Sequence, residues 1–408
     1  MGETWNPKDA AEVQAAVQDA VAQGRALELV GAGSRRGFGR PVTADVVLDL
    51  SALCGVVSYQ PEELVVTLAP GVRLAELQAL LATRRQQLAF EPPDLGPLWG
   101  LPAGRGTIGG MVMTGKGGPR RLTAGAPRDH CLGVKGVNGF GEAFAAGGRV
   151  VKNVTGFDLP KLVAGSFGTL CAVTELTLKV LPAPDDAATL VLLGLDDAAA
   201  IRAMSLALGS PAQAASAAHL PAEIAGASVL AGRIGAGVAA TLLRLEGVTP
   251  SIAARRAHLA GMLEAAAPQI LLDRDETQAV WKQVADVAVF AGDPDRPVWL
   301  ISVPPAAGAR VGARLAEELD GRCFYDWGGG GVWLEAPPAA DAHAAHIRGV
   351  LAQAVGADGH ATLIRAPGPV RSTMSPFQPL APALAALTER VRAQFDPDRL
   401  FNPGRMGA

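Results

Sequence analysis

GAGSRRGFGR, residues 31–40, is the stretch that decides between two kinds of nucleotide-binding fold. The dinucleotide fingerprint of a Rossmann fold is G-x-G-x-x-G on a strand-to-helix turn, but here the third glycine comes one residue late, at Gly37. ALELV (26–30) before the loop and DVVLDL (45–50) after it both have the composition of short strands. Because a Rossmann pyrophosphate needs a helix N-terminus, the order strand, loop, strand argues against that fold.

The loop instead predicts an anion nest, in which consecutive backbone N–H groups of a turn point inward at a phosphate group. Such a turn needs small residues, and Gly31, Ala32, Gly33 and Ser34 supply them. Arg35 can add a charge-assisted hydrogen bond. We therefore expect this loop to enclose a diphosphate without help from a helix end.

The composition excludes several classes of function. The 36 Lys and Arg residues and 39 Asp and Glu residues give a formal net charge of −3. A chain with this balance has no basic field that would recruit nucleic acid, so we expect no nucleic-acid partner. Its 408 residues are enough for two or three domains.

The cysteine pattern and the hydropathy of the sequence indicate the cellular compartment. None of the four cysteines, Cys54, Cys131, Cys171 and Cys323, belongs to a CxxC pair, so neither a zinc site nor an iron-sulfur cluster is predicted. The N-terminus, MGETWNPKDAAEV, does not look like a signal peptide, and no stretch of about 18 apolar residues is present. We expect a soluble, cytoplasmic protein with at most peripheral association at the inner face of the cytoplasmic membrane.

The distribution of motifs divides the chain into three parts. Residues 1–182 hold the glycine-rich segments, and Pro182 and Pro184 mark a boundary. Residues 187–368 are rich in alanine and predict a second α+β domain, with helices near 197–208, 251–267 and 275–289. Residues 369–408 form a tail that ends in an Asn-Pro-Gly turn.

Several motifs occur together in a fixed order: the loop at 31–39, PAGRGTIGG (102–110), GGMVMTGKGGPRR (109–121), KNVTGFDLPKLVAGSFGTL (152–170) and FDPDRLFNPGRM (395–406). With this set the chain resembles the vanillyl-alcohol-oxidase/p-cresol-methylhydroxylase (PCMH) family of FAD-binding proteins, and within it the smaller FAD-binding subunits of bacterial glycolate oxidase. The resemblance implies an α+β fold: a bipartite PCMH-type FAD-binding domain at 1–182, a cap domain at 187–368, and a tail at 369–408 that returns to the FAD domain.

The resemblance also assigns cofactor contacts, grouped in three segments. The first wraps the pyrophosphate, the second approaches the flavin, and the third lies against the adenine and ribose half. In chain order these residues are Gly31, Ala32, Gly33, Ser34, Arg35 and Gly37; Pro102, Thr107, Gly109 and Gly110; and Gly165, Ser166, Gly168 and Thr169.

Catalytic candidates are fewer and weaker. Arg120 and Arg121 follow a glycine pair and could face the isoalloxazine, where a cation stabilises negative charge on a reduced flavin. Either could instead bind a substrate carboxylate, or could be a surface arginine that holds a loop. His360 and Arg365 are further candidates near a substrate, and the catalytic base remains unassigned.

Histidines and cysteines bear on flavin attachment and on metals. The 31–40 loop contains neither, and His130 and Cys131 are more consistent with buried structural roles, so we expect non-covalent FAD. Relatives that oxidise 2-hydroxy acids carry a metal motif, H-x-G-D-G-N-x-H. Here the comparable segment is DGHATLIRAPG (358–368), and His343 and His346 lack a third ligand, so we expect no metal site.

Three functional hypotheses follow. The first is an FAD-containing subunit of a glycolate dehydrogenase complex that oxidises glycolate to glyoxylate, working with a larger FAD-binding subunit and an iron-sulfur subunit. In that complex this chain relays electrons or orders the assembly. The second is a self-sufficient FAD-dependent oxidoreductase acting on another small 2-hydroxy acid or alcohol. The third is a non-catalytic structural subunit, which the intact glycine-rich segments disfavour.

Overall fold

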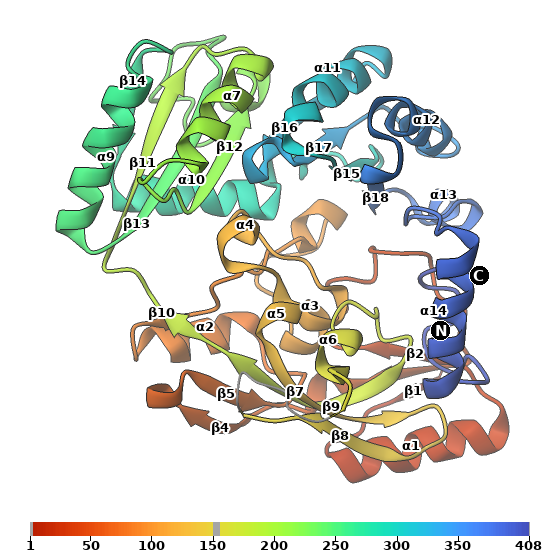
Figure 1. Ribbon diagram of the computed structural model, residues 1–408. Coiled ribbons are helices and arrows are strands. Elements are labelled where there is room, and N and C mark those ends of the chain that lie inside the picture. Colours follow the sequence, from red (N-terminus) through yellow and green to blue (C-terminus); the bar gives the residue numbers. More distant parts are fainter. Residues whose placement is uncertain (1–2, 150–155, 408) are drawn as a thin grey trace.

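The computed structural model describes residues 3–149 and 156–407. The first four residues of the KNVTGFDLPKLVAGSFGTL motif, 152–155, therefore lie outside the described residues. The described chain has an α+β fold built on four sheets. Three smaller sheets occupy the lower half of Figure 1, and one large sheet with its helices occupies the upper half. The α+β class predicted from the sequence is confirmed.

The three smaller sheets come from the first part of the chain. A parallel sheet has the order β1-β3-β2, an antiparallel sheet of five strands has the order β4-β5-β9-β7-β8, and β6 pairs with β10. The strands are β1 (Glu3–Trp5), β2 (Leu27–Val30), β3 (Val46–Asp49), β4 (Val56–Gln60), β5 (Val65–Leu68), β6 (Gln86–Gln87), β7 (Cys131–Asn138), β8 (Ala143–Gly147), β9 (Cys171–Lys179) and β10 (Leu181–Pro182).

The connection from β2 to β3 tests the order of strand, loop and strand that the sequence predicts. The two strands pair in parallel, and residues 31–45 between them, all of them described, contain no helix. The predicted order of strand, loop and strand is therefore confirmed. A parallel pair joined without a helix is not the βαβ unit of a Rossmann fold.

Short helices surround these sheets: α1 (Ala10–Gln23), α2 (Leu74–Ala82), α3 (Ile108–Thr114), α4 (Arg121–Ala124), α5 (Pro127–His130) and α6 (Leu159–Val163). Helix α1 shows how local signals set its bounds. The Asp9 side chain accepts a hydrogen bond from the backbone N–H of Glu12, and Gly24 ends the helix with φ of 63°. Val13 and Val17, four residues apart, are both fully buried against the parallel sheet.

The large sheet is antiparallel and has eight strands in the order β14-β11-β13-β12-β16-β17-β15-β18. Its strands are β11 (Asp186–Leu193), β12 (Ser216–Leu220), β13 (Ala240–Gly247), β14 (Gln269–Leu272), β15 (Val298–Ser302), β16 (Arg322–Asp326), β17 (Gly331–Glu335) and β18 (His360–Arg365). Its helices are α7 (Asp197–Leu208), α8 (Ala222–Gly226), α9 (Thr249–Leu263), α10 (Arg274–Asp286), α11 (Gly308–Glu318) and α12 (Ala344–Val355).

Alternation along each strand gives this sheet two apolar faces. Leu190 and Leu192 pack into a core with α7, α9, α11 and α12. Val191, between them, belongs to a second core that includes Trp281 of α10 and also Phe38 and Phe167 from the first part of the chain. One face of the large sheet is thus packed on α10 and on loops of the first part of the chain, which brings residues of both parts together.

The end of the chain returns to the parallel sheet after α13 (Gly368–Thr373) and α14 (Pro382–Phe395). The Leu27 N–H donates to the Leu400 carbonyl, and the Asn402 N–H donates to the Leu27 carbonyl, both at 2.8 Å. The Asn402 side chain accepts from the Leu29 N–H at 2.9 Å and donates to the Phe167 carbonyl at 2.8 Å. Asn402 therefore ties the tail to β2 and to the segment before β9.

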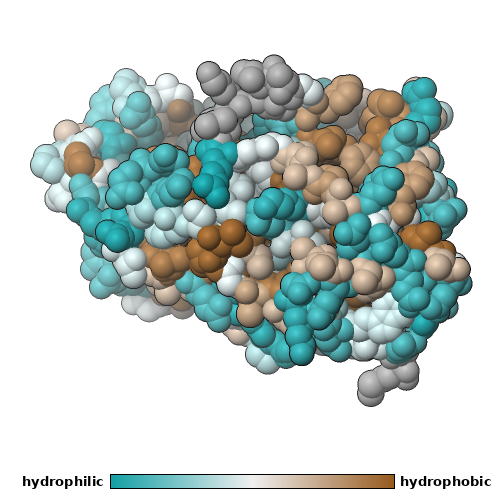
Figure 2. Space-filling view, turned by 90° about the horizontal axis from the view of Figure 1, so that it is seen from below, coloured by the Kyte–Doolittle hydropathy of each residue, from teal (hydrophilic) through white to brown (hydrophobic). Residues whose placement is uncertain are grey.

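The helices and the surface bear on contact with a membrane. Within the described residues, no helix is both long enough and apolar enough to cross a bilayer. On the face shown in Figure 2, apolar side chains gather in small patches between hydrophilic ones.

We predict that Asn402→Ala lowers the free energy of unfolding by about 2–4 kcal/mol, because the buried Leu29 N–H and Phe167 carbonyl lose their partner. Urea unfolding followed by circular dichroism measures this change. The control is Gln353→Ala, which removes an exposed amide. Equal stability of the Asn402 variant and the wild type would contradict the role assigned to Asn402.

Candidate functional site

The glycine loop forms one wall of a cavity with about 760 Å³ of space between its protein atoms. We call it the glycine-loop cavity. Its walls come from the end of β2 and the following loop, from α3, from the start of β9 and from the C-terminal tail. The lining residues are Leu29 to Arg36, Leu50, Pro70, Thr107, Gly109, Gly110, Met113, Thr114, Phe167, Gly168, Cys171, Val173, Asn402 and Arg405.

The backbone of the loop has the character of a nest. The Arg36 N–H donates to the Gly33 carbonyl at 3.2 Å, which closes a turn, and Gly33 has a φ of 72°. Among the described residues, no acceptor is recorded for the backbone N–H groups of Ala32, Gly33 and Ser34. Three successive donors that line a cavity without internal partners are suited to bind an anion.

The opposite wall is the first turn of α3, and the two walls lie very close together. A Cβ atom placed on Gly31 would lie 2.6 Å from the Thr107 Oγ1 atom. That hydroxyl caps α3 by accepting from the Gly110 N–H at 3.3 Å. Position 31 therefore accepts only glycine unless the walls separate.

Arg35 supplies a buried positive charge beside the nest. Its Nη2 atom donates to the Pro93 carbonyl at 2.7 Å, whereas its Nη1 atom is buried and has no hydrogen-bond partner in the part of the chain that the structure describes. Burial lowers the pKa of Arg35 to about 10, against the opposing effect of Asp94 and Asp286. A buried donor left without a partner carries a desolvation cost that an anionic ligand would offset.

The neighbouring cations differ from Arg35 in their surroundings. Arg36 is half exposed, and its Nε atom donates to Glu28 at 2.9 Å. Arg405 is buried and donates to the Arg35 carbonyl at 2.9 Å, and burial lowers its pKa to about 10. Arg35 and Arg405 thus bring two desolvated charges to the glycine-loop cavity.

A second cavity lies between the smaller sheets and the large sheet and contains about 1010 Å³ of space. We call it the basic cavity, because its charged residues are Lys116, Arg121, Arg128 and His360, and none of the described residues in its wall is an acid. Strands β15 and β18 of the large sheet contribute to it. Thr114 and Phe167 line both cavities, so the two spaces adjoin.

The positive charges of the basic cavity affect one another. Burial, together with Arg121 and Arg35, lowers the pKa of Lys116 to about 8. Burial also lowers the pKa of His360, and Lys116 and Arg121 add to this effect. His360 is therefore held neutral near pH 7, while Lys116 retains most of its charge there. Such a cavity favours an anionic occupant.

The structure brings most of the sequence-predicted cofactor residues together. Those that line the glycine-loop cavity are Gly31, Ala32, Gly33, Ser34, Arg35, Thr107, Gly109, Gly110 and Gly168. Gly165 lines the basic cavity instead. Gly37 packs against Trp99, while Ser166 and Thr169 are buried and bonded within their own turn, and these three together with Pro102 line neither cavity.

The catalytic candidates are divided. Arg121 and His360 both line the basic cavity. Arg120 points away from it into an ion-pair cluster with Glu91 and Glu246. Arg365 is fully buried and donates to Glu335 at 2.8 Å and to backbone carbonyls, away from both cavities.

Sequence reasoning missed residues that the structure places in the cavity walls. Lys116 lay inside the quoted GGMVMTGKGGPRR motif, and Asn402 and Arg405 lay inside FNPGRM, yet none was named as a site residue. Phe167, which lies between the predicted contacts Gly165 and Gly168, lines both cavities but is not among the residues predicted from the sequence. A cation inside a glycine-rich motif, as at Lys116, was the available signal.

The remaining histidines and cysteines have structural surroundings. His130 Nε2 lies 2.7 Å from the Ala124 carbonyl, and His346 pairs with Glu318. Cys171 lines the glycine-loop cavity, where burial raises the pKa of its thiol to about 12. Among the described residues, no group of three or more His, Cys, Asp or Glu side chains is placed to hold a metal ion.

The fold is that of FAD-binding proteins of the PCMH type. An FAD-binding domain model matches residues 4–147. The structure of p-cresol methylhydroxylase superposes with a TM-score of 0.72 at 14% identity, covering 99% of this chain and 88% of that one.

Sequence comparison is more specific. The chain is 33% identical to glycolate oxidase subunit GlcE of Escherichia coli K12, over 96% of this chain and 95% of GlcE. It is 34% identical to glycolate oxidase subunit GlcD of Bacillus subtilis, over 38% of this chain and 31% of GlcD. The chain therefore belongs to the family of glycolate oxidase subunit GlcE.

Asp326, next to the basic cavity, is a buried titratable group whose protonation can be tested. Asp326 precedes Trp327, which lines the cavity, and its carboxylate accepts from the Trp327 N–H at 2.7 Å. Burial raises the pKa of Asp326 from 3.8 to about 7. The folded protein thus keeps a proton on Asp326 between about pH 4 and 7, where the unfolded chain releases it.

We predict that the stability contributed by this proton is lost as the pH rises from about 4 to 7. Asp326→Asn mimics the protonated acid, so its free energy of unfolding relative to wild type should rise by up to about 4 kcal/mol between pH 4 and pH 8. Urea unfolding at several pH values measures the difference, with exposed Asp358→Asn as control. A pH-independent difference would contradict this assignment.

Proposed function

We propose that this chain binds FAD non-covalently as a subunit of a glycolate oxidase (glycolate dehydrogenase) complex, in which it relays electrons or orders the assembly. The observation that carries the proposal is the wall of the glycine-loop cavity, which contains the buried Arg35 and the residues Ala32, Gly33 and Ser34, whose backbone N–H groups have no acceptor among the described residues. Beside them, a Cβ atom on Gly31 would lie 2.6 Å from Thr107 Oγ1. These groups fit a diphosphate. Membership of the GlcE family supports the choice of complex.

The residues have separate proposed roles. The N–H groups of Ala32, Gly33 and Ser34, with Arg35 and Arg405, would bind the pyrophosphate. Since the two cavities adjoin at Thr114 and Phe167, the flavin ring would lie toward the basic cavity. Pro102, Gly165, Ser166 and Thr169 remain proposed contacts of the second and third segments. Bound FAD supplies an acceptor for two electrons.

The residues of the basic cavity would act on charge and protons there. Lys116 and Arg121 place positive charge beside the proposed ring position, which favours negative charge on an occupant. His360, held neutral by desolvation and by these cations, can accept a proton near pH 7. Phe167 packs edge-on against Phe38 and Phe377, and this aromatic group limits access of water between the cavities.

The proposed partners are a larger GlcD-like flavin subunit, at which glycolate is oxidised to glyoxylate, and an iron-sulfur subunit. The four cysteines of this chain are scattered, three of them buried, and do not form a cluster-binding set, so another subunit would carry the iron-sulfur centre. We propose that the final acceptor is quinone-linked, with the complex in the cytoplasm and in peripheral contact with the inner face of the cytoplasmic membrane.

A second candidate function is oxidation of a small 2-hydroxy acid by this chain alone. The basic cavity favours it, because Lys116, Arg121 and Arg128 surround a space large enough for a carboxylate substrate next to the proposed flavin position. Arg120 and Arg365 form ion pairs with Glu246 and Glu335, so we assign them no role in substrate binding.

We predict that Arg35→Met weakens FAD binding about 10- to 100-fold, because it removes a charge-assisted hydrogen bond to the pyrophosphate. Arg36→Met is the matched control, since Arg36 is half exposed and paired with Glu28, and it should weaken binding less than about threefold. Fluorescence titration of the apoprotein with FAD measures both. Equal affinities in the two variants would contradict the role of Arg35.

We predict that the purified chain is yellow, that denaturation releases its FAD, and that glycolate bleaches this flavin only when the larger subunit is co-expressed. Visible absorption of the chain with and without its partners measures this. Rapid bleaching of the lone chain would favour the second candidate. A colourless chain that cannot be reconstituted with FAD would leave only a structural role.

A further inference from the structure

We propose that four charged residues, the buried Arg120 and Arg244 and the partly buried Glu91 and Glu246, form a clamp that positions Lys116 and Arg121 in the basic cavity. We call this group the clamp cluster. In this proposal Arg120 and Glu246 are positioning residues that touch neither flavin nor substrate. The inference rests on the proposed function insofar as the basic cavity receives the flavin.

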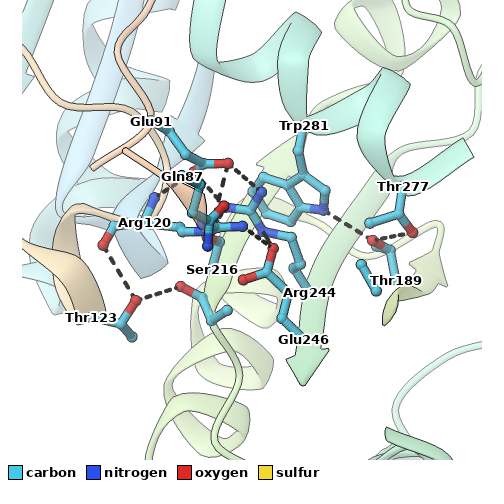
Figure 3. Close-up of polar contacts among 12 residues, drawn as sticks. Gln87, Glu91, Arg120, Thr123, Thr189, Ser216, Arg244, Glu246, Thr277 and Trp281 are labelled. Atoms are coloured by element: carbon cyan, nitrogen blue, oxygen red, sulfur yellow. Dashed lines mark hydrogen bonds and ion pairs between the residues drawn. The ribbon is translucent and has the colours of Figure 1, made fainter. Parts of the chain in front are cut away.

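The clamp cluster joins the two parts of the chain (Figure 3). Arg244, on β13 of the large sheet, donates from Nη1 and Nη2 to the two carboxylate oxygens of Glu91, both at 2.6 Å. Arg120, in the segment before α4, donates from Nη2 to Glu246 of β13 at 2.5 Å. The Arg120 N–H donates to Glu91 at 3.1 Å. Each arginine thus contacts a carboxylate from the other part.

A further set of contacts fixes the clamp cluster in place. The Arg244 guanidinium lies over the Trp281 ring, 4.6 Å from its centroid, and also donates to Ser216 Oγ at 2.5 Å. The Trp281 ring N–H donates to Thr189 Oγ1 at 2.9 Å. Arg120 Nη1 donates to Gln87 Oε1 at 2.9 Å. The side chains therefore have little rotational freedom, and the cluster can hold only one arrangement of the two parts.

The balance of charge and burial suits a positioning role better than a stabilising one. Two arginines face two glutamates, and the side chains of Arg120 and Arg244 are 10% and 4% exposed. A buried ion-pair cluster adds little net stability over an apolar core, because desolvation offsets the attraction, but it requires a specific geometry. The cluster therefore fixes where the large sheet lies relative to the Arg120 backbone.

That backbone leads directly into the basic cavity. Lys116 and Gly117 of the cavity wall precede Arg120 in sequence, and Arg121 follows it. Gly118 between them is held from both sides, because its N–H donates to the Phe90 carbonyl at 2.9 Å and its carbonyl accepts from the Trp327 ring N–H at 3.2 Å.

The same segment is also fixed at its far end. The Arg121 guanidinium lies over the Trp327 ring, 5.2 Å from its centroid, and Thr123 Oγ1 donates to the Ala215 carbonyl at 3.0 Å. A shift of Arg120 relative to β13 therefore moves Lys116 and Arg121 within the cavity. Because Arg120 lies outside the cavity, it acts in this proposal only by holding the backbone that carries Lys116 and Arg121.

The test uses the FAD-loaded full chain and the variant Glu246→Gln, which keeps the shape of the side chain and removes its charge. The matched control is Glu335→Gln, because Glu335 is likewise buried in the large sheet and ion-paired with arginines, Arg322 and Arg365, but lines neither cavity. Thr123→Val is a milder second variant that removes the hydrogen bonds from Thr123 Oγ1 to the Ala215 carbonyl, at 3.0 Å, and to the Arg120 carbonyl, at 3.3 Å.

Two measurements are made on each variant. The first is the equilibrium of flavin reduction against a reference dye, together with the visible absorption spectrum. The second is the rate at which acetic anhydride modifies Lys116, followed by peptide mass spectrometry with exposed Lys135 as internal reference. The second measurement also works on protein without FAD, so it remains valid if the proposed function fails.

We expect Glu246→Gln to shift the reduction equilibrium and the Lys116 modification rate at least threefold, Thr123→Val to shift them in the same direction by less, and Glu335→Gln to leave both within 1.5-fold of wild type. If Glu246→Gln lowers stability as Glu335→Gln does but leaves both readouts unchanged, the clamp cluster is only structural and the proposal is overturned. Should Glu246→Gln fail to fold, an unchanged Lys116 rate in Thr123→Val would overturn it equally.

Discussion

The structure depends on one constraint: Ala32, Gly33 and Ser34 line a cavity, and their three backbone N–H groups have no partner within residues 3–149 and 156–407. A chain that leaves such donors unpaired has to hold them in place by other means. Here α3 lies against Gly31, and the Asn402 side chain bonds to both β2 and the segment before β9. Three distant segments therefore converge to build one diphosphate-sized site.

Electrostatics gives the two adjoining cavities a common character. Arg35 and Arg405 lie at the glycine-loop cavity, and Lys116 and Arg121 lie at the basic cavity. For Arg35, Arg405 and Lys116 the desolvation cost is visible as a lowered pKa. Where glutamates are available, as in the clamp cluster, they pair with Arg120 and Arg244 outside both cavities. The fold thus keeps positive charge at the places proposed for anionic groups, although Arg405 also lies 3.7 Å from Glu28.

The sequence was sufficient wherever the deciding signal was local. The strands on either side of residues 31–45, the stripe of Val13 and Val17 on α1 and the short helix at Ile108–Thr114 all follow from neighbouring residues. Local sequence could not show that Arg121 lines the basic cavity while Arg120 points away from it. The directions of these side chains depend on Trp327 and Glu246, more than a hundred residues away. Asn402 bonds Leu29 across 373 positions, a contact that a local pattern does not encode.

The most direct measurement compares FAD with riboflavin, which has the same ring system and no diphosphate, in calorimetric titrations of the apoprotein. If the nest at Ala32–Ser34 and Arg35 is the main anchor, one FAD binds per chain and riboflavin binds at least about 100-fold more weakly, since several charge-assisted hydrogen bonds are missing. Comparable affinities for the two molecules, or no binding of FAD at all, would contradict the account.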